Sequence, residues 1–457
     1  MNHLLREVLP ALGLDESYAA AHLDLAPGSG LPAALPVGTL AAGSVAAAAV
    51  AGAALRGAGR VRVDPRQVAV SFRGDQVQTL DGRHEAGFAP LSGFFEASDG
   101  WVRTHGNYPH HRDRLLWALE LPEGAGRDDA ARVIAQRSAQ ELEDTVTADH
   151  GIAVRVRSLR EWMAGEQAAA VRRHDVLTVA ATGDAPPVPI RPRPRVLDLT
   201  RVIAGPVATR TLAYLGCDVL RVDNPQLPEL QAQHLDTDAG KRSTLADLHE
   251  ERARERLHEL LAEADVLVTG YRPGALAAYG LDPDHLAQVH PQLVCATLSA
   301  WTPSGPWGAR RGFDSIVQAA TGIAMVESSD GHRPGALPAQ ALDHATGYLL
   351  AAGVLTALRQ RAERGGTWRV GAHLARTAHW LLQTDALDGP AQPVDDPGPW
   401  VSETDTELGR LVQSRPAFEV EGMPARFAWA GRPWGSDEAV WAEAAPGRAH
   451  SLGREGG

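Results

Sequence analysis

The chain has 457 residues, of which 44% are hydrophobic and 22% charged, so it can bury a sizeable core, and about two to three domains are expected from its length. With 44 basic and 56 acidic residues the formal net charge is −12, so the chain lacks the excess of basic residues that is typical of a nucleic-acid-binding protein. Two cysteines, Cys217 and Cys295, exclude a disulfide framework and a CxxC zinc site, and favour a reducing, cytoplasmic compartment.

The amino-terminal segment shows no basic start followed by an apolar stretch and a small-residue cleavage pattern, so we expect no signal peptide there. Residues 31–55 carry no charge and are long enough to cross a bilayer. They are mostly Ala and Gly with two prolines, however, and such residues gain little from transfer into lipid. We therefore expect a helix buried in a soluble core and no membrane partner.

The next region predicts a small α+β domain. Residues 87–106 predict a strand pair around Asp99-Gly100, because an Asp-Gly turn between strand-like segments is a strong hairpin signal. Arg- and Glu-rich stretches with helical spacing follow at 112–119, 128–145 and 158–173.

Five prolines in residues 181–195 predict a semi-rigid linker, and the block that follows alternates strands and helices. Strands are expected at 195–199, 217–223, 265–269 and 292–299, with helices through 215 and at 252–264, 313–321 and 343–360. Strands that are apolar throughout and alternate with helices predict an α/β fold with a doubly wound, parallel, Rossmann-like sheet.

A second Pro-rich break lies at residues 387–400 and completes the predicted domain organisation. The expected parts are a degenerate half with an Ala-rich helix and the small α+β domain (1–180), the linker (181–195), the Rossmann-like domain (196–386), and the break with a tail that returns onto the core (387–457).

An internal repeat also crosses the linker. Residues 35–56 align without gaps within residues 337–359 when Arg56 is matched to Arg359. Asp343 then matches Leu40, so that only the second copy carries a carboxylate. Similar Ala-rich composition in two helices could give the same match by chance.

The turn at residues 200–206 follows a strand and opens a helix, which is where a dinucleotide-binding fold holds its phosphates. Asp223 ends the next strand, at about the spacing of a ribose-binding acid. The turn has one glycine in place of GxGxxG, so a pyrophosphate could not approach closely and an NAD or FAD site is not expected. The helix amino terminus stays a candidate site for another phosphate ligand.

Other common chemistries have no support in the sequence. No metal-ligand spacing or GxSxG elbow occurs, and we expect neither a metal nor a permanently bound cofactor. The 18 histidines are scattered except for His110-His111, which we expect in a solvated loop. Cys217 and Cys295 are expected to be inert core residues of buried strands.

Asp343 is the strongest candidate for chemistry, because it lies at the start of a long, largely uncharged helix. A carboxylate near a helix amino terminus is stabilised as the anion, and an Asp with the ordinary pKa of ~3.9 is ionised at neutral pH. The residue could be an N-terminal cap or a nucleophile. The two roles are compatible, because a cap is one way to keep a nucleophilic carboxylate ionised.

Several segments, in order, resemble family III CoA-transferases (the CaiB/BaiF group of formyl-CoA, carnitine and bile-acid CoA-transferases). They cover about residues 195–382 and include RVLDLTRVIAGPVATRTLAYLGCDVLRVDNP, GKRSTLADL, ADVLVTGYRPGALAAYGL, HPQLVCATLSAW, GFDSIVQAATG and ALDHATG. The amino-terminal half resembles the family's later portion, so the resemblance implies a fused pair of degenerate copies. It also implies a homodimer, although the internal fusion could replace one partner.

The resemblance implies an acyl-CoA:carboxylate CoA-transferase in which Asp343 attacks the thioester, forms an acyl anhydride and then an aspartyl-CoA thioester. Coenzyme A and acyl-CoA are then substrates, beside a carboxylic acid. The CoA contacts carried over are Ile203, Ala204, Asn224, Asp247, His249, Gly270, Tyr271, Arg272, Arg311, Phe313 and Asp314. Of these, Arg272 and Arg311 suit the CoA phosphates chemically. Small-domain side chains, Trp301, Phe313 and Met325 are expected to shape the acyl pocket.

Two alternatives stay open. An α-methylacyl-CoA racemase of the same superfamily would need a proton-transferring His where this chain has Phe313, and His344 is a poor substitute because adjacent helix positions do not face each other. The other alternative is a catalytically inactive CoA-binding homologue, because this chain departs from the family at several positions. It has Asp223 where the family usually has Glu, Gly270 where it has Asn, and Ala278 where a basic residue is common, and its small domain lacks a Gly-Gly-Gly stretch.

Overall fold

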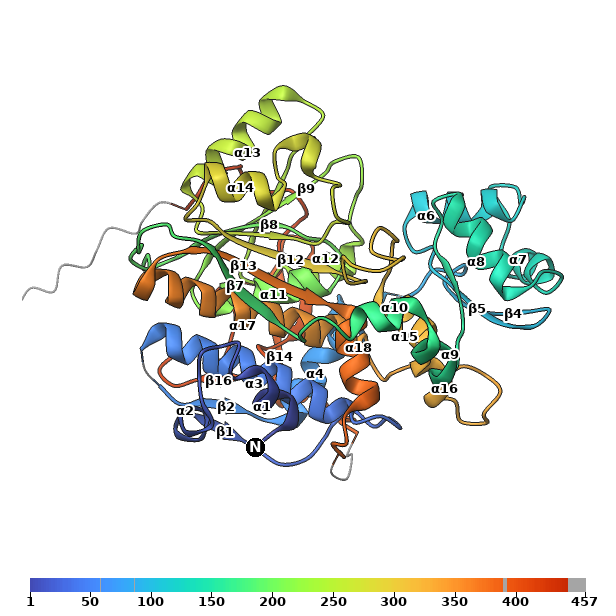
Figure 1. Ribbon diagram of the computed structural model, residues 1–457, viewed down its shortest axis with the longest axis horizontal. Coiled ribbons are helices and arrows are strands. Elements are labelled where there is room, and N and C mark those ends of the chain that lie inside the picture. Colours follow the sequence, from blue (N-terminus) through green and yellow to red (C-terminus); the bar gives the residue numbers. More distant parts are fainter. Residues whose placement is uncertain (58, 86, 389–392, 443–457) are drawn as a thin grey trace, which may run out of the picture.

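The computed structural model describes residues 1–57, 59–85, 87–388 and 393–442, and is built around a mixed sheet of seven strands (Figure 1). The strand order is β10-β9-β8-β11-β12-β13-β7. The bounds are β7 (Thr178–Gly183), β8 (Arg195–Leu199), β9 (Asp218–Asp223), β10 (Arg242–Leu245), β11 (Val266–Thr269), β12 (Val294–Ser299) and β13 (Thr367–His373).

Six of these strands are parallel, which confirms the α/β class and the doubly wound sheet, but β7 runs antiparallel to β13. The expectation of a purely parallel sheet is therefore wrong at this edge, and residues 181–183 of the expected linker belong to a strand. An exposed edge of β13 would leave backbone donors and acceptors unpaired, and β7 covers it.

Both faces of the sheet are buried, because alternate side chains of each strand point to opposite sides. Val196, Val219 and Val266 join the core beneath the long helix α17 (Ala341–Arg364) and α11 (Ala204–Tyr214). Leu197, Leu220 and Leu267 join a second core on the other face, under α13 (Glu251–Glu263) and α14 (Pro283–Val289). The remaining helices of this part are α12 (Gln231–Thr237), α15 (Asp314–Thr321), α16 (Ile323–Val326) and α18 (Leu374–Gln383). Residues 178–383 are called the sheet unit below.

The uncharged segment at 31–55 forms α3 (Val37–Arg56), which packs along α17 over much of its length. By length and composition α3 and α17 could each cross a membrane, and 89% and 100% of their most apolar windows are buried inside the structure. The expected buried helix is confirmed. Small residues on both helices let them approach closely.

The two predicted repeat segments have the same order of elements. Helix α3 leads into β2 (Val61–Val63) and α4 (Pro65–Phe72), as α17 leads into β13 and α18. Strand β2 lies between a parallel neighbour, β1 (Leu23–Leu25), and an antiparallel one, β16 (Glu419–Val420); β13 likewise lies between parallel β12 and antiparallel β7. The shared order agrees with duplication, which stays a prediction.

Residues 93–155 form a small unit with its own apolar core, which projects at the right of Figure 1. It contains the predicted hairpin as β4 (Gly93–Ala97) and β5 (Gly100–Thr104), followed by α6 (Pro109–Ala118), α7 (Arg127–Ile134), α8 (Ala139–Ala148) and β6 (Ala153–Arg155).

Two predicted helices are each broken in two. The helix expected at 128–145 is interrupted before Ser138, whose side chain accepts the amide of Glu141 and so caps α8. The helix expected at 158–173 is interrupted at the extended Gly165, which separates α9 (Leu159–Ala164) from α10 (Glu166–Val171). Helical periodicity continued across both breaks, so only the capping chemistry could have located them.

The carboxy-terminal part returns onto the core over residues 401–442. Strands β14 (Val401–Thr406) and β15 (Gly409–Ser414) form a hairpin that pairs with β3 (Thr79–Leu80). Farther on, the indole of Trp434 donates to Asp223 at 2.9 Å. Residues 389–392 of the predicted break and 443–457 of the predicted tail lie outside the described residues. The other elements are α1 (His3–Val8), α2 (Glu16–His22), α5 (Gly74–Val77) and short 3₁₀ turns at Ala277–Tyr279 and Gly398–Trp400.

The crossing of α11 and α17 gives a stability prediction. A Cβ added at Gly347 would lie 2.4 Å from the carbonyl oxygen of Ala204 and 3.1 Å from the Cβ of Val207. Gly347→Ala is therefore expected to lower the free energy of unfolding by about 1–3 kcal/mol, the usual cost of overpacking a close contact. Urea unfolding measures it. Gly124→Ala is the control, because a Cβ there meets nothing within 4 Å, and equal stabilities of the two variants would contradict the prediction.

Candidate active site

A cavity of about 550 Å³ lies where the sheet unit meets the small unit. Its sheet-side wall comes from the loops that follow β8, β11 and β12, all at the carboxyl edge of the parallel strands. Strand β8 has β9 on one side and β11 on the other, so the chain reverses its direction of winding here, which is where open α/β sheets bind ligands. Side chains of the small unit close the opposite wall.

Asp343 reaches this cavity from the first turn of α17 and is 6% exposed. It does not cap its own helix, so the cap interpretation is wrong. The cap comes from Asp314, whose Oδ2 accepts the amides of Leu342 at 2.8 Å and Asp343 at 3.0 Å. The amide of Gln318 donates to the other oxygen of Asp314. A neighbouring helix thus satisfies the free backbone amides of α17 and leaves the Asp343 carboxylate for the cavity.

The electrostatics of Asp343 also differ from the expectation. Burial, and secondarily the charge of Asp314, raises the pKa of Asp343 well above its ordinary value. Burial likewise raises the pKa of Asp314 to about 6. The helix terminus was expected to hold Asp343 ionised, but loss of hydration outweighs it in this site. The protonation state of Asp343 is therefore sensitive to any change of charge or hydration in the cavity.

Arginines dominate the cavity wall. Arg311 has its pKa lowered by burial and by the charges of Arg272 and Arg114, so three guanidinium groups from three different segments repel one another here. Arg310 is held by Glu143 at 2.8 Å and Arg201 lies 3.6 Å from Glu229. Among the described residues that line the cavity, Asp343 is the one carboxylate. A wall with this charge favours ligands that carry negative charge.

Most predicted contact residues meet in this cavity. Its lining includes Ile203, Ala204, Gly270, Tyr271, Arg272, Arg311, Phe313 and Asp343, and also Trp301, but not Met325. Asp314 lies behind the wall as the helix cap.

Besides Asp314, three predicted contacts do not line the cavity: Asn224, Asp247 and His249. Asn224 follows β9 and accepts the amide of Gln226 at 2.8 Å. Asp247 follows β10 and accepts the amide of His249, whose ring faces Tyr279 edge-on. They lie farther along the same carboxyl edge of the sheet, because β9 and β10 are the outer strands on that side.

Sequence reasoning missed several lining residues, most of them from the small unit. These are Tyr108, His110, His111, Arg114, His150, Arg201 and Arg310. The expectation that His110-His111 lies in a solvated loop is wrong: the His111 ring is 8% exposed and packs edge-on against Phe313 at 5.7 Å, and burial lowers its pKa to about 2. Arg201 could have been found from its place directly after β8, but the small-unit residues carried no signal.

Asp223, which lies at about the spacing of a ribose-binding acid, is buried and bound to Arg221 at 2.8 Å and to the Trp434 indole. The expectation for the two cysteines holds. Cys217 and Cys295 are buried, and burial raises the pKa of each thiol to about 12, which makes both inert core residues.

Residues 194–408 match the model of CoA-transferase family III. The chain is 31% identical to the acetyl-coenzyme A transferase nodX of Hypoxylon pulicicidum, over 65% of this chain and 55% of the relative. It is 36% identical to a probable fatty acyl-CoA transferase of Mycobacterium tuberculosis (37% and 47%) and 33% identical to the formyl-CoA:oxalate CoA-transferase of Streptomyces coelicolor (42% and 50%). A crystal structure of the M. tuberculosis protein aligns with a TM-score of 0.40 at 34% identity, over 43% of this chain and 57% of that one. The chain spans about half the length of the curated relatives it matches.

The Asp314–Asp343 pair gives a prediction about ionisation. Asp314→Asn removes the negative neighbour, so the pKa of Asp343 should fall and its carboxylate should form at lower pH. A carboxyl ¹³C titration of protein labelled at Asp, assigned with Asp343→Asn, measures the shift.

Asp388→Asn is a matched control for that titration. Asp388 accepts the amides of Gly38 at 2.6 Å and Thr39 at 2.7 Å, so it caps α3 as Asp314 caps α17, and Leu40 replaces the titrating acid there. Asparagine caps a helix about as well as aspartate does, so both variants are expected to keep their caps and to differ only in the charge that they remove. An unchanged Asp343 titration in Asp314→Asn would contradict the prediction.

Proposed function

Because residues 194–408 match the model of CoA-transferase family III, we propose that this chain is an acyl-CoA:carboxylate CoA-transferase with Asp343 as its nucleophile. One observation carries the proposal: in the described lining of a cavity at the switch point of the sheet, Asp343 is the one carboxylate and the other ionised side chains are arginines. The nucleophile and the groups that suit a polyanionic substrate thus share one site.

Coenzyme A carries a diphosphate and a 3′-phosphate, and guanidinium groups bind phosphate with paired hydrogen bonds. Arg114, Arg272 and Arg311 face one another without an intervening carboxylate in the cavity lining, which suits this ligand. Asn224, Asp247 and His249 are proposed to contact the part of coenzyme A that extends along the sheet edge.

The proposed reaction has four balanced steps. The Asp343 carboxylate attacks the thioester carbonyl of the donor, giving an aspartyl-acyl anhydride and the CoA thiolate. The thiolate attacks the aspartyl carbonyl, which releases the donor acid and leaves an aspartyl-CoA thioester. The incoming carboxylate attacks this thioester, forming a second anhydride and freeing the thiolate, which then takes the new acyl group and restores Asp343. Each covalent intermediate divides one difficult exchange into easier steps.

Two residue positions favour CoA transfer over the racemase alternative. Phe313 lines the cavity where a racemase would need its His, and a phenyl ring transfers no proton. His344 is buried, stacks on Phe72 at 4.9 Å and has its pKa lowered to about 3 by burial. Neither position therefore supplies the second proton carrier that racemisation needs.

We further propose a cytoplasmic enzyme that forms a homodimer. The small unit and the sheet unit that enclose the cavity come from one chain, so the second copy is not needed to complete the wall. We propose that side chains of Trp301, Phe313 and the small unit shape the pocket that receives the acyl group and the acceptor acid.

Covalent capture tests the mechanism. Incubation with a panel of acyl-CoAs should add a CoA-sized mass to the intact protein, hydroxylamine should remove it, and Asp343→Ala should show none. Asp388→Asn, which leaves the cavity intact, should keep the adduct. Intact-protein mass spectrometry makes the measurement. If no donor gives an adduct although CoA still binds, the next experiment is exchange of the α-proton of an acyl-CoA, which tests the racemase alternative. No exchange either would favour the inactive homologue.

The arginine wall gives a second test. Arg311→Ala is expected to weaken CoA binding about tenfold or more, because a hydrogen bond to a charged group contributes about 1.5–3 kcal/mol. Calorimetry at two salt concentrations measures the affinity, and its salt dependence should shrink as well. Arg252→Ala, on the exposed side of α13, is the control and should bind CoA as the wild type does. Equal affinities in both variants would contradict the role of Arg311.

A further inference from the structure

The loop after β8 contains a strained residue at the cavity wall. Val202 has a φ of +72°, a left-handed conformation that a β-branched side chain rarely adopts, and it lines the cavity beside Ile203 and Ala204. Such a conformation persists only where surrounding contacts determine it, and strain of this kind concentrates at functional sites. The amide of Val202 donates to Oε2 of Glu229 at 3.1 Å.

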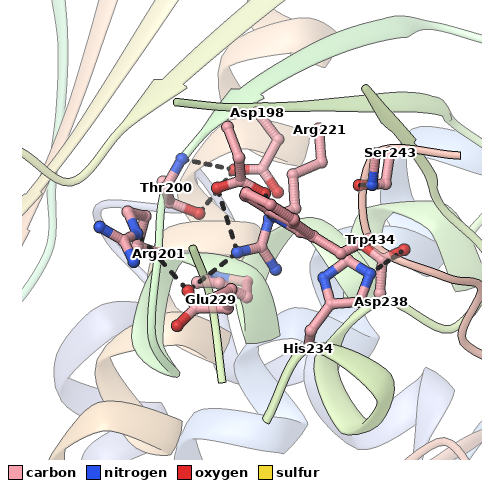
Figure 2. Close-up of polar contacts among 12 residues, drawn as sticks. Asp198, Thr200, Arg201, Arg221, Glu229, His234, Asp238, Ser243 and Trp434 are labelled. Carbon is pink, nitrogen blue, oxygen red and sulfur yellow. Dashed lines mark hydrogen bonds and ion pairs between the residues drawn. The ribbon is translucent and has the colours of Figure 1, made fainter. Parts of the chain in front are cut away.

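Glu229 is a buried carboxylate on which several segments converge, as Figure 2 shows. Its Oε2 also accepts from Arg221 at 3.0 Å and lies 3.6 Å from Arg201. Its Oε1 accepts the amide of Leu230 at 3.1 Å and the hydroxyl of Tyr108. These donors keep the pKa of Glu229 below its ordinary value despite burial, so the group is an anion that needs all of them.

Tyr108 belongs to the small unit, directly before α6, and is 3% exposed. The guanidinium of Arg201 lies 5.0 Å from the centre of its ring. The ring of His111 meets Tyr108 edge-on at 5.7 Å and meets Phe313 of the sheet unit at 5.7 Å as well. The hydroxyl of Tyr108 is therefore part of the surface by which the small unit docks at the cavity.

We propose that Glu229 is a positioning residue that couples docking of the small unit to the strained conformation of Val202. One carboxylate oxygen holds the hydroxyl of Tyr108 and the other holds the amide of Val202, so loss of either contact loosens the other. The wall formed by residues 202–204 and the wall formed by the small unit then assemble together. The consequence for substrate rests on the proposed function, in which the cavity binds acyl-CoA.

The first test needs no substrate. Tyr108→Phe removes a hydroxyl that does not touch the loop backbone, yet it should raise the exchange rate of the Val202 amide by about tenfold, as expected when one bond to a charged group is lost. Glu229→Gln should raise it at least as much. Hydrogen exchange followed by mass spectrometry of peptides covering 199–204 measures this.

Glu327→Gln is the matched control, because Glu327 also accepts two amides of a distant segment, those of Ala34 and Leu35 at 3.0 Å, but away from the cavity. It should leave the 199–204 peptides unchanged. A fall in melting temperature in Tyr108→Phe without faster exchange in these peptides would mean a merely structural role, and would overturn the proposal.

The second test is a double-mutant cycle on CoA affinity with wild type, Tyr108→Phe, Glu229→Gln and the double variant. Each single variant should weaken CoA binding about tenfold, and the double variant should bind no worse than the weaker single one, because contacting residues are not additive. Additive losses would overturn the coupling. If wild type itself neither binds CoA nor forms the covalent adduct, the proposed function fails, while the exchange experiment still decides the coupling.

Discussion

The close packing of α3 on α17 is the contact on which the rest of the structure depends. Two long helices made largely of small and aliphatic residues can approach closely and bury nearly all of their surface. This contact fixes the amino-terminal segment against the sheet unit. It also places the first turn of α17, with Asp343, at the carboxyl edge of the sheet, where a ligand can reach it.

The first turns of these two helices differ in the residue that lies beside the cap. Asp388 caps α3, where the neighbouring position is Leu40, and Asp314 caps α17, where it is the ionisable Asp343. A cap supplied from another helix leaves Asp343 free to face the cavity, and at the same time adds a negative charge beside it. Burial and that charge disfavour the anion, so Asp343 is harder to ionise than an exposed aspartate.

The cavity belongs to two units at once, and this explains why buried polar groups lie at their junction. Glu229 bonds the strained loop of the sheet unit and Tyr108 of the small unit, and Glu143 bonds Arg310 across the same junction. Buried carboxylates are costly unless they are fully hydrogen-bonded, so each requires the two units to be in place together. The site therefore depends on docking as well as on local structure.

The sequence by itself determined the α/β class, the strands β8, β9, β11 and β12 and the buried helix α3, because these follow from local periodicity. It also singled out Asp343 as a candidate nucleophile, which stays a prediction. It did not determine the antiparallel edge strand β7, the breaks at Ser138 and Gly165, or the cap from Asp314. Nor could it show that His111, Tyr108 and Arg114 line the site or that burial raises the pKa of Asp343. Those features are set by contacts between segments far apart in the chain, and only the tertiary structure decides which groups lose water and which charges become neighbours.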